Sequence, residues 1–190
     1  MAKTALHPVL VIMGVSGSGK STVAGLLASR LGWDFVEGDD LHPASNVRKM
    51  HAGRALTDED RWPWLEIIAG WIRRHTLSGV PGVVTCSALK KRYRDVLRSE
   101  GVVFVFLDGS RDRISDRLAS RHGHFMPPAM LGSQFEALEA PTEDENSITV
   151  RAGATPADEA QEIIDRLQLR SAGAGRSWAA QPAPRPAIHV

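Results

Sequence analysis

The chain has 190 residues, of which 43% are hydrophobic and 24% are charged, which is the balance of a single soluble globular domain. Its 23 basic and 22 acidic residues leave a net charge of +1, so the whole protein offers no general attraction for nucleic acid or a membrane surface. A single cysteine excludes an internal disulfide and gives no sign of a thiolate zinc site. The chain has no signal-peptide pattern and no apolar run of about 20 residues, which favours a cytoplasmic protein without a membrane segment.

The first predicted elements are a strand, a loop and a helix. Apolar residues fill Val9–Met13, as in a strand that is buried on both faces. From Lys20 onward, apolar residues recur at helical spacing up to Gly32, a residue suited to a helix C-terminus. The intervening sequence GVSGSGKS, here named the phosphate loop (residues 14–21), matches the pattern G-x-x-x-x-G-K-[ST].

This pattern is typical of a loop that binds the phosphates of a nucleotide. Glycines let successive backbone N–H groups approach an anion closely, next to the positive end of a helix. We expect Lys20 to reach the β and γ phosphates and the hydroxyl of Ser21 to bind Mg²⁺. The sequence therefore predicts a site for ATP and magnesium. Its expected contacts are Gly14, Val15, Ser16, Gly17, Ser18, Gly19, Lys20, Ser21 and Thr22.

The next segment is predicted to hold a strand and two helices. The strand is expected over Trp33–Glu37, and a short helix is expected in the polar stretch after Pro43. Thr57 can cap a longer helix whose first turn is acidic. The core face of that helix is predicted to be formed by Trp64, Ile67, Ile68 and Trp71.

The second half of the chain continues the alternation. Strands are predicted at Val83–Cys86, Val102–Asp108 and 147–152, with Ser87 as the cap of the helix between the first two. Further helices are expected from Ser110 to about 121, over 130–139 and over 155–169. Five strands alternating with helices imply an α/β fold, with a five-stranded parallel sheet covered by helices on both faces. Residues 171–190, rich in Ala, Gly and Pro, are predicted to be a disordered tail.

Three classes of protein share a phosphate loop: switch GTPases, ATPase or motor modules, and small-molecule kinases. The D-x-x-G and N-K-x-D motifs of Ras-type GTPases are absent from the sequence, and there is no long domain for mechanical coupling. A chain of this size, with polar insertions after its second and fourth strands, is similar to nucleoside monophosphate kinases and shikimate kinases. In that architecture the acceptor binds at the carboxyl ends of the parallel strands.

Acidic and basic residues follow the second predicted strand. Of the acids Glu37, Asp39 and Asp40, we expect Asp39 to orient or deprotonate the acceptor hydroxyl, and Asp40 to act as a cap. A second acid in this group is a candidate for holding magnesium waters. The cationic candidates beyond them are His42, Arg48, Lys49, Arg54 and Arg61. Each alone is more often a solvated surface charge, but together they suggest an anionic acceptor held by arginine.

Several motifs together resemble the gluconate kinases, ATP-dependent D-gluconate 6-phosphotransferases with a three-layer P-loop NTPase fold. They lie between about residues 10 and 141 and read GVSGSGKS, GDDLHP, LTDEDRWPWL, CSALKKRYRD, RHGHFMP and QFEALEAP. The resemblance implies a kinase domain over 1–170, with an acceptor-binding insertion at about 40–60 and a mobile lid at about 122–130. It also implies a homodimer. Asp40 departs from the apolar residue expected at that position.

The resemblance assigns roles to individual residues. Lys20, Asp39 and Arg121 are implied to be catalytic, with Arg117 near the adenine and Arg121 on the transferred phosphate. Arg61 is the preferred partner of the gluconate carboxylate, and Gln134 either follows lid closure or caps it. The residues implied around the acceptor are Asp39, His42, Lys49, Arg61, Ser87, Lys90 and Gln134.

Two other interpretations remain open on the sequence alone. The enzyme can be a kinase of another small carboxylated polyol or of shikimate. Alternatively, the chain can be a nucleotide-binding regulatory module with little turnover, which requires an acceptor pocket that does not function. Release of ADP in the presence of different acceptors separates these possibilities.

Overall fold

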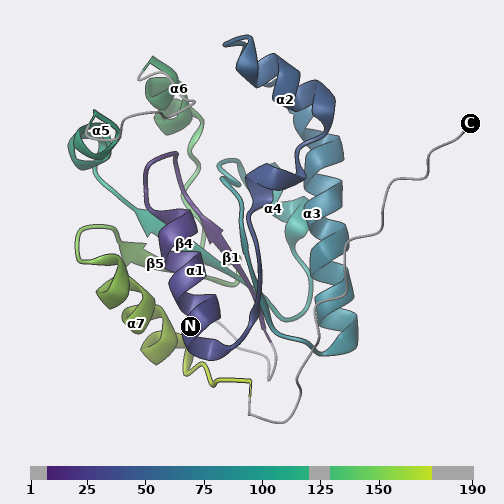
Figure 1. Ribbon diagram of the computed structural model, residues 1–190, viewed down its shortest axis with the longest axis vertical. Coiled ribbons are helices and arrows are strands. Elements are labelled where there is room, and N and C mark those ends of the chain that lie inside the picture. The colour runs from purple at the N-terminus through teal and green to yellow at the C-terminus, as the bar shows by residue number, and fades with distance from the viewer. Residues whose placement is uncertain (1–7, 120–128, 173–190) are drawn as a thin grey trace, which may run out of the picture.

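A five-stranded parallel sheet forms the centre of the protein (Figure 1). The structure, a computed structural model, describes residues 8–119 and 129–172. The order of the strands across the sheet is β2-β3-β1-β4-β5, and every neighbouring pair is parallel. The strands are β1 Val9–Met13, β2 Asp34–Val36, β3 Gly82–Thr85, β4 Val102–Asp108 and β5 Ser147–Arg151. The predicted α/β fold with five parallel strands is confirmed.

Helices cover the sheet on both sides and complete three layers. Helices α1 and α7 pack on one face, and α3 and α4 pack on the other (Figure 1). Helices α2, α5 and α6 lie toward the carboxyl ends of the strands. The helices are α1 Lys20–Leu31, α2 Ala44–His51, α3 Asp58–Ser78, α4 Lys91–Leu97, α5 Arg111–Ala119, α6 Ala129–Ala137 and α7 Pro156–Leu167, and a 3₁₀ turn, η1, spans Gly38–Leu41.

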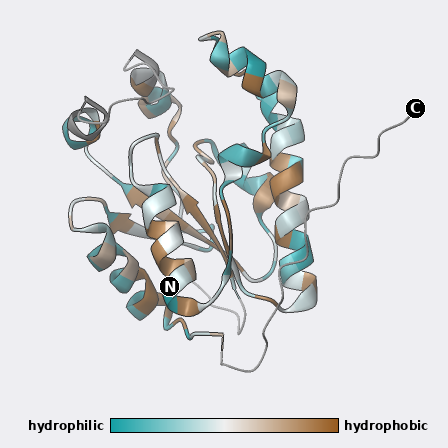
Figure 2. Ribbon diagram, in the orientation of Figure 1, coloured by the Kyte–Doolittle hydropathy of each residue, from teal (hydrophilic) through white to brown (hydrophobic). Residues whose placement is uncertain are grey.

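Strand β1 is the most deeply buried element of the sheet, as its apolar sequence predicts. None of its five residues is exposed to solvent. Leu10 and Ile12 contribute to the core beneath α1 and α7, while Val9, Val11 and Met13 contribute to the core beneath α3 and α4. Figure 2 shows the corresponding hydrophobic colour along the sheet and the helix faces that cover it. Both faces of the central strand are therefore fixed, and so is the point at which the phosphate loop leaves it.

Helix α3 begins as predicted, but its buried face is rotated from the predicted one. Thr57 caps it, and the Asp60 carboxylate accepts from the Thr57 backbone N–H, which completes a capping box. The buried residues are Trp64, Leu65, Ile68, Ala69 and Ile72. Ile67, predicted in the core, is 44% exposed, and Trp71 is only partly buried. Apolar residues at helical spacing occur on two adjacent faces of this helix. The prediction of a buried Ile67 was wrong because Ile67 lies on the face that is exposed to solvent.

Ser87 does not cap a helix, contrary to the sequence prediction. Helix α4 starts at Lys91, with Lys90 at the N-cap position and no side-chain capping bond. Residues 86–90 instead form a loop, here named the β3–α4 loop, with Ala88 at a φ of 43°. The left-handed conformation at Ala88 turns the chain away from a helical path, so three residues separate Ser87 from the start of α4.

Some predicted features lie outside the described residues. These are Arg121, most of the predicted lid and residues 173–190 of the predicted tail; α6 already begins at Ala129, inside the range predicted for the lid. Within residues 8–119 and 129–172, no helix combines the length and the apolar character needed to span a bilayer.

The two isoleucines of α3 provide a test of its packing. Ile68 is fully buried and Ile67 is 44% exposed. Ile68→Ala is expected to lower the free energy of unfolding by about 2–5 kcal/mol, because it leaves a cavity against the sheet. Ile67→Ala, the matched control, should change it by no more than about 0.5 kcal/mol. Urea unfolding of both variants measures the difference, and equal losses would contradict the observed orientation of α3.

Candidate active site

The phosphate loop joins β1 to α1 along a path that requires glycine. Gly14, Gly17 and Gly19 have φ values of 140°, 80° and 100°, which residues other than glycine rarely adopt. A Cβ atom at Gly14 would lie 2.9 Å from the carbonyl oxygen of Leu107 and 3.1 Å from Ser18 Oγ. The glycines predicted to shape the loop are therefore needed for its backbone conformation and for its close approach to β4.

Donor groups in this loop suit a phosphate ligand. The Ser18 hydroxyl is buried, and among the described residues it has no hydrogen-bond partner. Gly19 brings no capping side chain to α1, and Ser21 and Thr22 are exposed in the first helical turn. A buried hydroxyl without a partner costs free energy, and an anion at the start of α1 is favoured by the helix dipole. The chemistry of this donor set therefore fits the phosphates of a nucleotide.

Lys20 is electrostatically linked to the acids at the end of β2. Its ammonium group donates to the carbonyl oxygen of Val15 at 3.0 Å. Burial lowers the pKa of Lys20 below its ordinary value, and the negative charges of Asp39 and Glu37 oppose that shift. The fold thus brings together Lys20 and Asp39, two of the residues predicted to be catalytic. Burial also raises the pKa of the nearby Cys86 thiol to about 12, so this cysteine is not a nucleophile.

Asp39 follows Gly38, whose backbone N–H and carbonyl are both hydrogen-bonded to side chains. The N–H of Gly38 donates to Thr85 Oγ1 at 3.0 Å, and its carbonyl accepts from Trp64 Nε1 at 2.7 Å. The Thr85 hydroxyl in turn donates to the Glu37 carboxylate. A Cβ atom at Gly38 would collide with the Thr85 carbonyl oxygen, so no other residue fits there. The exposed Asp39 side chain therefore starts from a fixed backbone position.

His42, predicted within a cationic set, is a neutral ring in the structure. It stacks on Trp64, with ring centroids 4.1 Å apart and an interplanar angle of 17°. Burial, and to a lesser extent the charge of Arg61, lowers the pKa of His42 to about 4. The amide of Asn46 lies 3.3 Å from His42 Nδ1, and as a donor it requires that nitrogen to be unprotonated. The inclusion of His42 among the cations was therefore wrong.

Three cations surround one aromatic ring and share one carboxylate. We name this group the Tyr93 cluster, formed by Arg61, Lys90, Arg92, Tyr93 and Asp58. The three cationic groups lie 5.6 to 5.8 Å from the centroid of the Tyr93 ring. Lys90 Nζ is 3.2 Å and Arg61 Nη1 is 3.7 Å from Asp58 Oδ1, and Arg92 and the Tyr93 hydroxyl also contact that carboxylate. Three positive charges against one negative charge leave the cluster positive.

Lys49 is already engaged inside the protein. Its ammonium group donates to Asp60 Oδ2 at 2.6 Å, and this hydrogen bond, with the Thr57 backbone N–H, lowers the pKa of Asp60 to about 2. Because Asp60 belongs to the capping box of α3, Lys49 fastens α2 to the start of α3. The structure therefore gives Lys49 a role that needs no ligand, while Arg48 and Arg54 are exposed.

The remaining predicted residues fall in different places. Ser87 is half-buried, and its carbonyl accepts from the backbone N–H of Gly14 at 3.3 Å. Gln134 contacts the phosphate loop, where its Oε1 accepts from the N–H of Ser16 at 2.7 Å. Arg121 and the side chain of Arg117 lie outside the described part of the chain.

Sequence reasoning did not identify Asp58, Tyr93 or Thr85. Asp58 was interpreted only as part of the acidic first turn of α3, although its carboxylate joins four other side chains. Tyr93 lies in the motif CSALKKRYRD, three residues after Lys90. On a helix this spacing puts two side chains on one face, which was the available signal that they are neighbours. Thr85 was interpreted only as part of the strand β3, and its neighbours Glu37 and Gly38 are far away in sequence.

A cavity of about 430 Å³ opens beside the Tyr93 cluster. Its lining residues are Lys90, Lys91, Arg92, Asp95 and Glu139. Two of these belong to the cluster, and none belongs to the phosphate loop. The cavity therefore lies beside the Tyr93 cluster and is not lined by the phosphate loop.

Comparisons with known proteins identify the family of this chain. Residues 16–168 match the family described as shikimate kinase. The chain is 49% identical over 161 residues to a gluconokinase of Gluconobacter oxydans (strain 621H), an alignment that covers 84% of this chain and 90% of that protein. The chain belongs to the gluconokinase family of P-loop kinases.

Two further members of the gluconokinase family support the assignment. The thermosensitive gluconokinase of Escherichia coli (strain K12) is 49% identical over 140 residues, covering 73% of this chain and 75% of that protein. The crystal structure of a gluconokinase from Sinorhizobium meliloti 1021 superimposes on this protein with a TM-score of 0.77. The match covers 87% of this chain and 94% of that one, and the two sequences are 43% identical. The family resemblance inferred from the motifs is confirmed.

The neutral state of His42 predicts how stability depends on pH. Its pKa is about 4 in the folded protein and 6.5 ordinarily, so the unfolded chain binds more protons between these values. Stability should therefore fall as the pH is lowered from about 6.5 to about 4. His42→Phe keeps a ring against Trp64 and cannot be protonated, so its stability should fall less. Urea midpoints across this pH range measure the effect.

The experiment compares His42→Phe with the wild type at the same pH values. An equal loss of stability in His42→Phe and the wild type would contradict the assignment of a buried neutral imidazole at His42.

Proposed function

We propose that this protein phosphorylates D-gluconate at its terminal hydroxyl, with ATP as the phosphoryl donor. The observation that carries this proposal is the electrostatic interaction of Asp39 with Lys20, in a chain that belongs to the gluconokinase family. The phosphate loop provides the donor side, and the residues after β2 provide the acceptor side. Both lie at the carboxyl ends of the strands, where open α/β sheets bind their ligands.

Nucleotide binding is assigned to the phosphate loop and the first turn of α1. Its N–H groups, the Ser18 hydroxyl and Lys20 offer donors to the phosphates, and Ser21 offers a hydroxyl oxygen to Mg²⁺. Among the described residues there is no cluster of three or more His, Cys, Asp or Glu that could hold a metal ion. A magnesium ion at this site would thus depend on phosphate oxygens, Ser21 and water. When bound, it neutralises charge on the phosphates.

Transfer proceeds by direct attack of the acceptor hydroxyl on the γ phosphorus. The bond between the acceptor oxygen and phosphorus forms while the bond between phosphorus and the β–γ bridging oxygen breaks, and ADP leaves. Asp39 orients the hydroxyl and accepts its proton, and Lys20 stabilises the charge that moves onto the leaving phosphate. The clamped Gly38 peptide keeps Asp39 in position for this step.

The carboxylate of gluconate is assigned to the Tyr93 cluster. Among the described residues, Arg61, Lys90 and Arg92 share only the Asp58 carboxylate, so a second anion relieves their mutual repulsion. Arg61 also contributes to the low pKa of His42, which supports a common acceptor site for this cluster and the ring that stacks on Trp64. A neutral His42 can donate a hydrogen bond to an acceptor hydroxyl without adding charge.

Three further assignments remain predictions from the sequence. Arg117 and Arg121 are expected on the nucleotide, the protein is expected to form a homodimer, and its compartment is expected to be the cytoplasm.

Measurement of ADP release with a panel of acceptors tests the proposed function. With ATP and Mg²⁺, gluconate should raise the rate far above the rate without acceptor, whereas shikimate and nucleoside monophosphates should not. A preference for shikimate would assign a different acceptor. A rate that no acceptor raises would favour a nucleotide-binding module.

Asp39 and Asp40 provide a matched pair of variants. Both are exposed in η1, but the electrostatic contact with Lys20 comes from Asp39. Asp39→Asn should lower kcat roughly 100-fold or more, because an amide cannot accept the hydroxyl proton. Asp40→Asn should have a much smaller effect. Steady-state kinetics at saturating ATP, with nucleotide titration as a check on binding, distinguishes them, and the reverse order of effects would move the acceptor site by one residue.

A further inference from the structure

Helix α6 makes a polar contact with the phosphate loop through Gln134. The side-chain Oε1 of Gln134 accepts a hydrogen bond from the backbone N–H of Ser16 at 2.7 Å, although the two residues are 118 apart in sequence. Gln134 is half-buried, so water competes less for this bond than at an exposed site. A helix distant in sequence thus determines the orientation of one peptide group in the loop.

The same peptide group holds the catalytic lysine. Its N–H belongs to Ser16 and its carbonyl oxygen to Val15, and that oxygen accepts from Lys20 Nζ at 3.0 Å and from the N–H of Ser18 at 3.2 Å. Because a peptide unit is planar, the N–H and the carbonyl cannot rotate independently. If the Ser16 N–H turns away from Gln134, the Val15 carbonyl must turn away from Lys20.

Apolar side chains also pack α6 against the phosphate loop. Val15, Leu89, Ile114 and Leu131 form a buried cluster, against which Phe135 and Leu138 of the α6 region pack. Val15 is only 2% exposed. The cluster therefore fixes the Val15 side chain, while Gln134 fixes the peptide that follows it. Together these contacts leave the Val15–Ser16 peptide little freedom to move.

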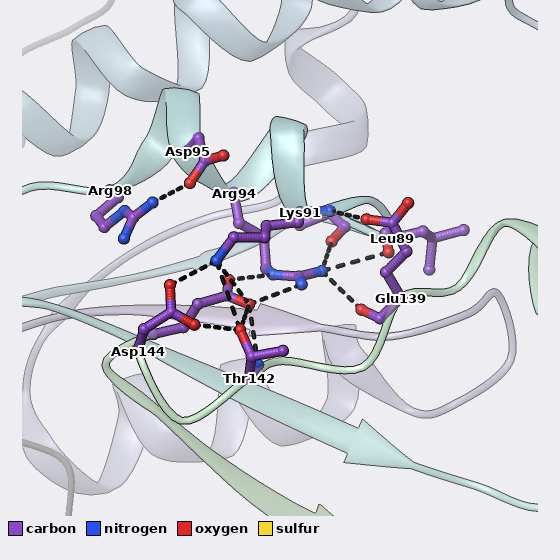
Figure 3. A network of polar contacts seen from close by, with 10 residues as sticks. Leu89, Lys91, Arg94, Asp95, Arg98, Glu139, Thr142 and Asp144 are labelled. Atoms are coloured by element: carbon purple, nitrogen blue, oxygen red, sulfur yellow. Dashed lines mark hydrogen bonds and ion pairs between the residues drawn. The ribbon is translucent and has the colours of Figure 1, made fainter.

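The other end of α6 is anchored to the β3–α4 loop (Figure 3). The N–H of Glu139 donates to the carbonyl of Leu89 at 2.8 Å, and the Glu139 carboxylate accepts from the N–H of Lys91 at 2.6 Å. The buried guanidinium of Arg94 donates to the carbonyls of Ala88, Leu89 and Glu139. Arg94 also pairs with Glu145 through two bonds of 2.6 and 2.9 Å. The position of Gln134 is thus set by a rigid network.

We infer that Gln134 is a positioning residue, which orients the Lys20 ammonium group on the phosphates by fixing the Val15–Ser16 peptide. Its side-chain oxygen contacts the phosphate loop at the backbone N–H of Ser16. This inference rests on the proposed function as far as ATP is concerned, but it does not depend on which acceptor is used. It assigns to α6 a part in nucleotide binding that continues into the transfer step.

A double-mutant cycle on ATP affinity tests the inference. Gln134→Met removes the acceptor oxygen but keeps the length and most of the packing of the side chain. In the wild-type background it should weaken ATP binding roughly 3- to 10-fold, the range expected for one hydrogen bond. In the Lys20→Met background the same change should have almost no effect, because Gln134 acts through Lys20. The readout is titration of ATP without any acceptor.

Two further variants keep the test independent of folding defects. Gln134→Asn keeps the amide but is shorter by one methylene group, so it should give the same non-additive pattern. Glu136→Met, on an exposed position of α6, is the control and should bind ATP as the wild type does. With gluconate, Gln134→Met should lower kcat roughly 10-fold or more and leave the KM for gluconate unchanged.

Three results would overturn the inference. Equal losses of ATP affinity in both backgrounds would show that Gln134 acts without Lys20. An increase confined to the KM for gluconate would make Gln134 an acceptor contact. Wild-type ATP affinity in both Gln134 variants would show that the contact with Ser16 has no role in nucleotide binding. Failure of the acceptor panel alone would contradict the proposed acceptor and leave the ATP titration unaffected.

Discussion

The close approach of the phosphate loop to the sheet is the constraint on which the active site depends. Gly14 lies so near the carbonyl of Leu107 that a side chain does not fit, and its own N–H donates to the carbonyl of Ser87. The loop therefore touches the ends of both strands that flank β1. Since those strands also lead into the β3–α4 loop and α5, their positions relative to the nucleotide follow from the strand order. The parallel sheet provides this geometry before any side-chain chemistry is added.

The charges of the candidate site differ between the phosphate loop and the residues proposed to bind the acceptor. On the donor side, burial lowers the pKa of Lys20, and the acids after β2 counteract the loss of its charge. On the acceptor side, positive charge is concentrated on Arg61, Lys90 and Arg92, while His42 is kept neutral. In the proposed function, the cationic groups hold the anionic substrate and the neutral ring offers a hydrogen bond to one of its hydroxyl groups.

The sequence predicted the features that depend on local patterns. The buried strand Val9–Met13, the glycines of the phosphate loop and the cap at Thr57 all have signals within a few residues, and the structure has them where expected. The predictions failed where geometry decided between similar options. Ile67 and Ile68 both satisfy helical spacing, and only the packing of α3 on the sheet determines which is buried. Ser87 is a good cap by type, but Ala88 turns the chain before a helix can start.

Contacts between distant segments had no signal in a single sequence. Gln134 was identified by its motif, but its bond to Ser16 spans 118 residues and depends on how α6 packs. Arg94 and Glu145 are 51 residues apart, and each alone is an ordinary charged residue of a helix or loop. The charge state of His42 was mispredicted for the same reason, because its ring loses solvent to Trp64, which approaches only in the folded protein.

The buried pair of Arg94 and Glu145 also limits how this sequence can change over time. Each side chain is 1% exposed, so loss of either charge by a single substitution leaves the other buried without its main partner, at a cost of about 3–5 kcal/mol. Replacement of both by apolar residues removes that cost but takes the Arg94 donor away from the carbonyls of Ala88 and Glu139. Single substitutions at Arg94 or Glu145, and replacement of both by apolar residues, are therefore all expected to destabilise the fold. The exposed pair of Arg98 and Asp95 has no such restriction, so neighbouring positions on one helix are expected to evolve at very different rates.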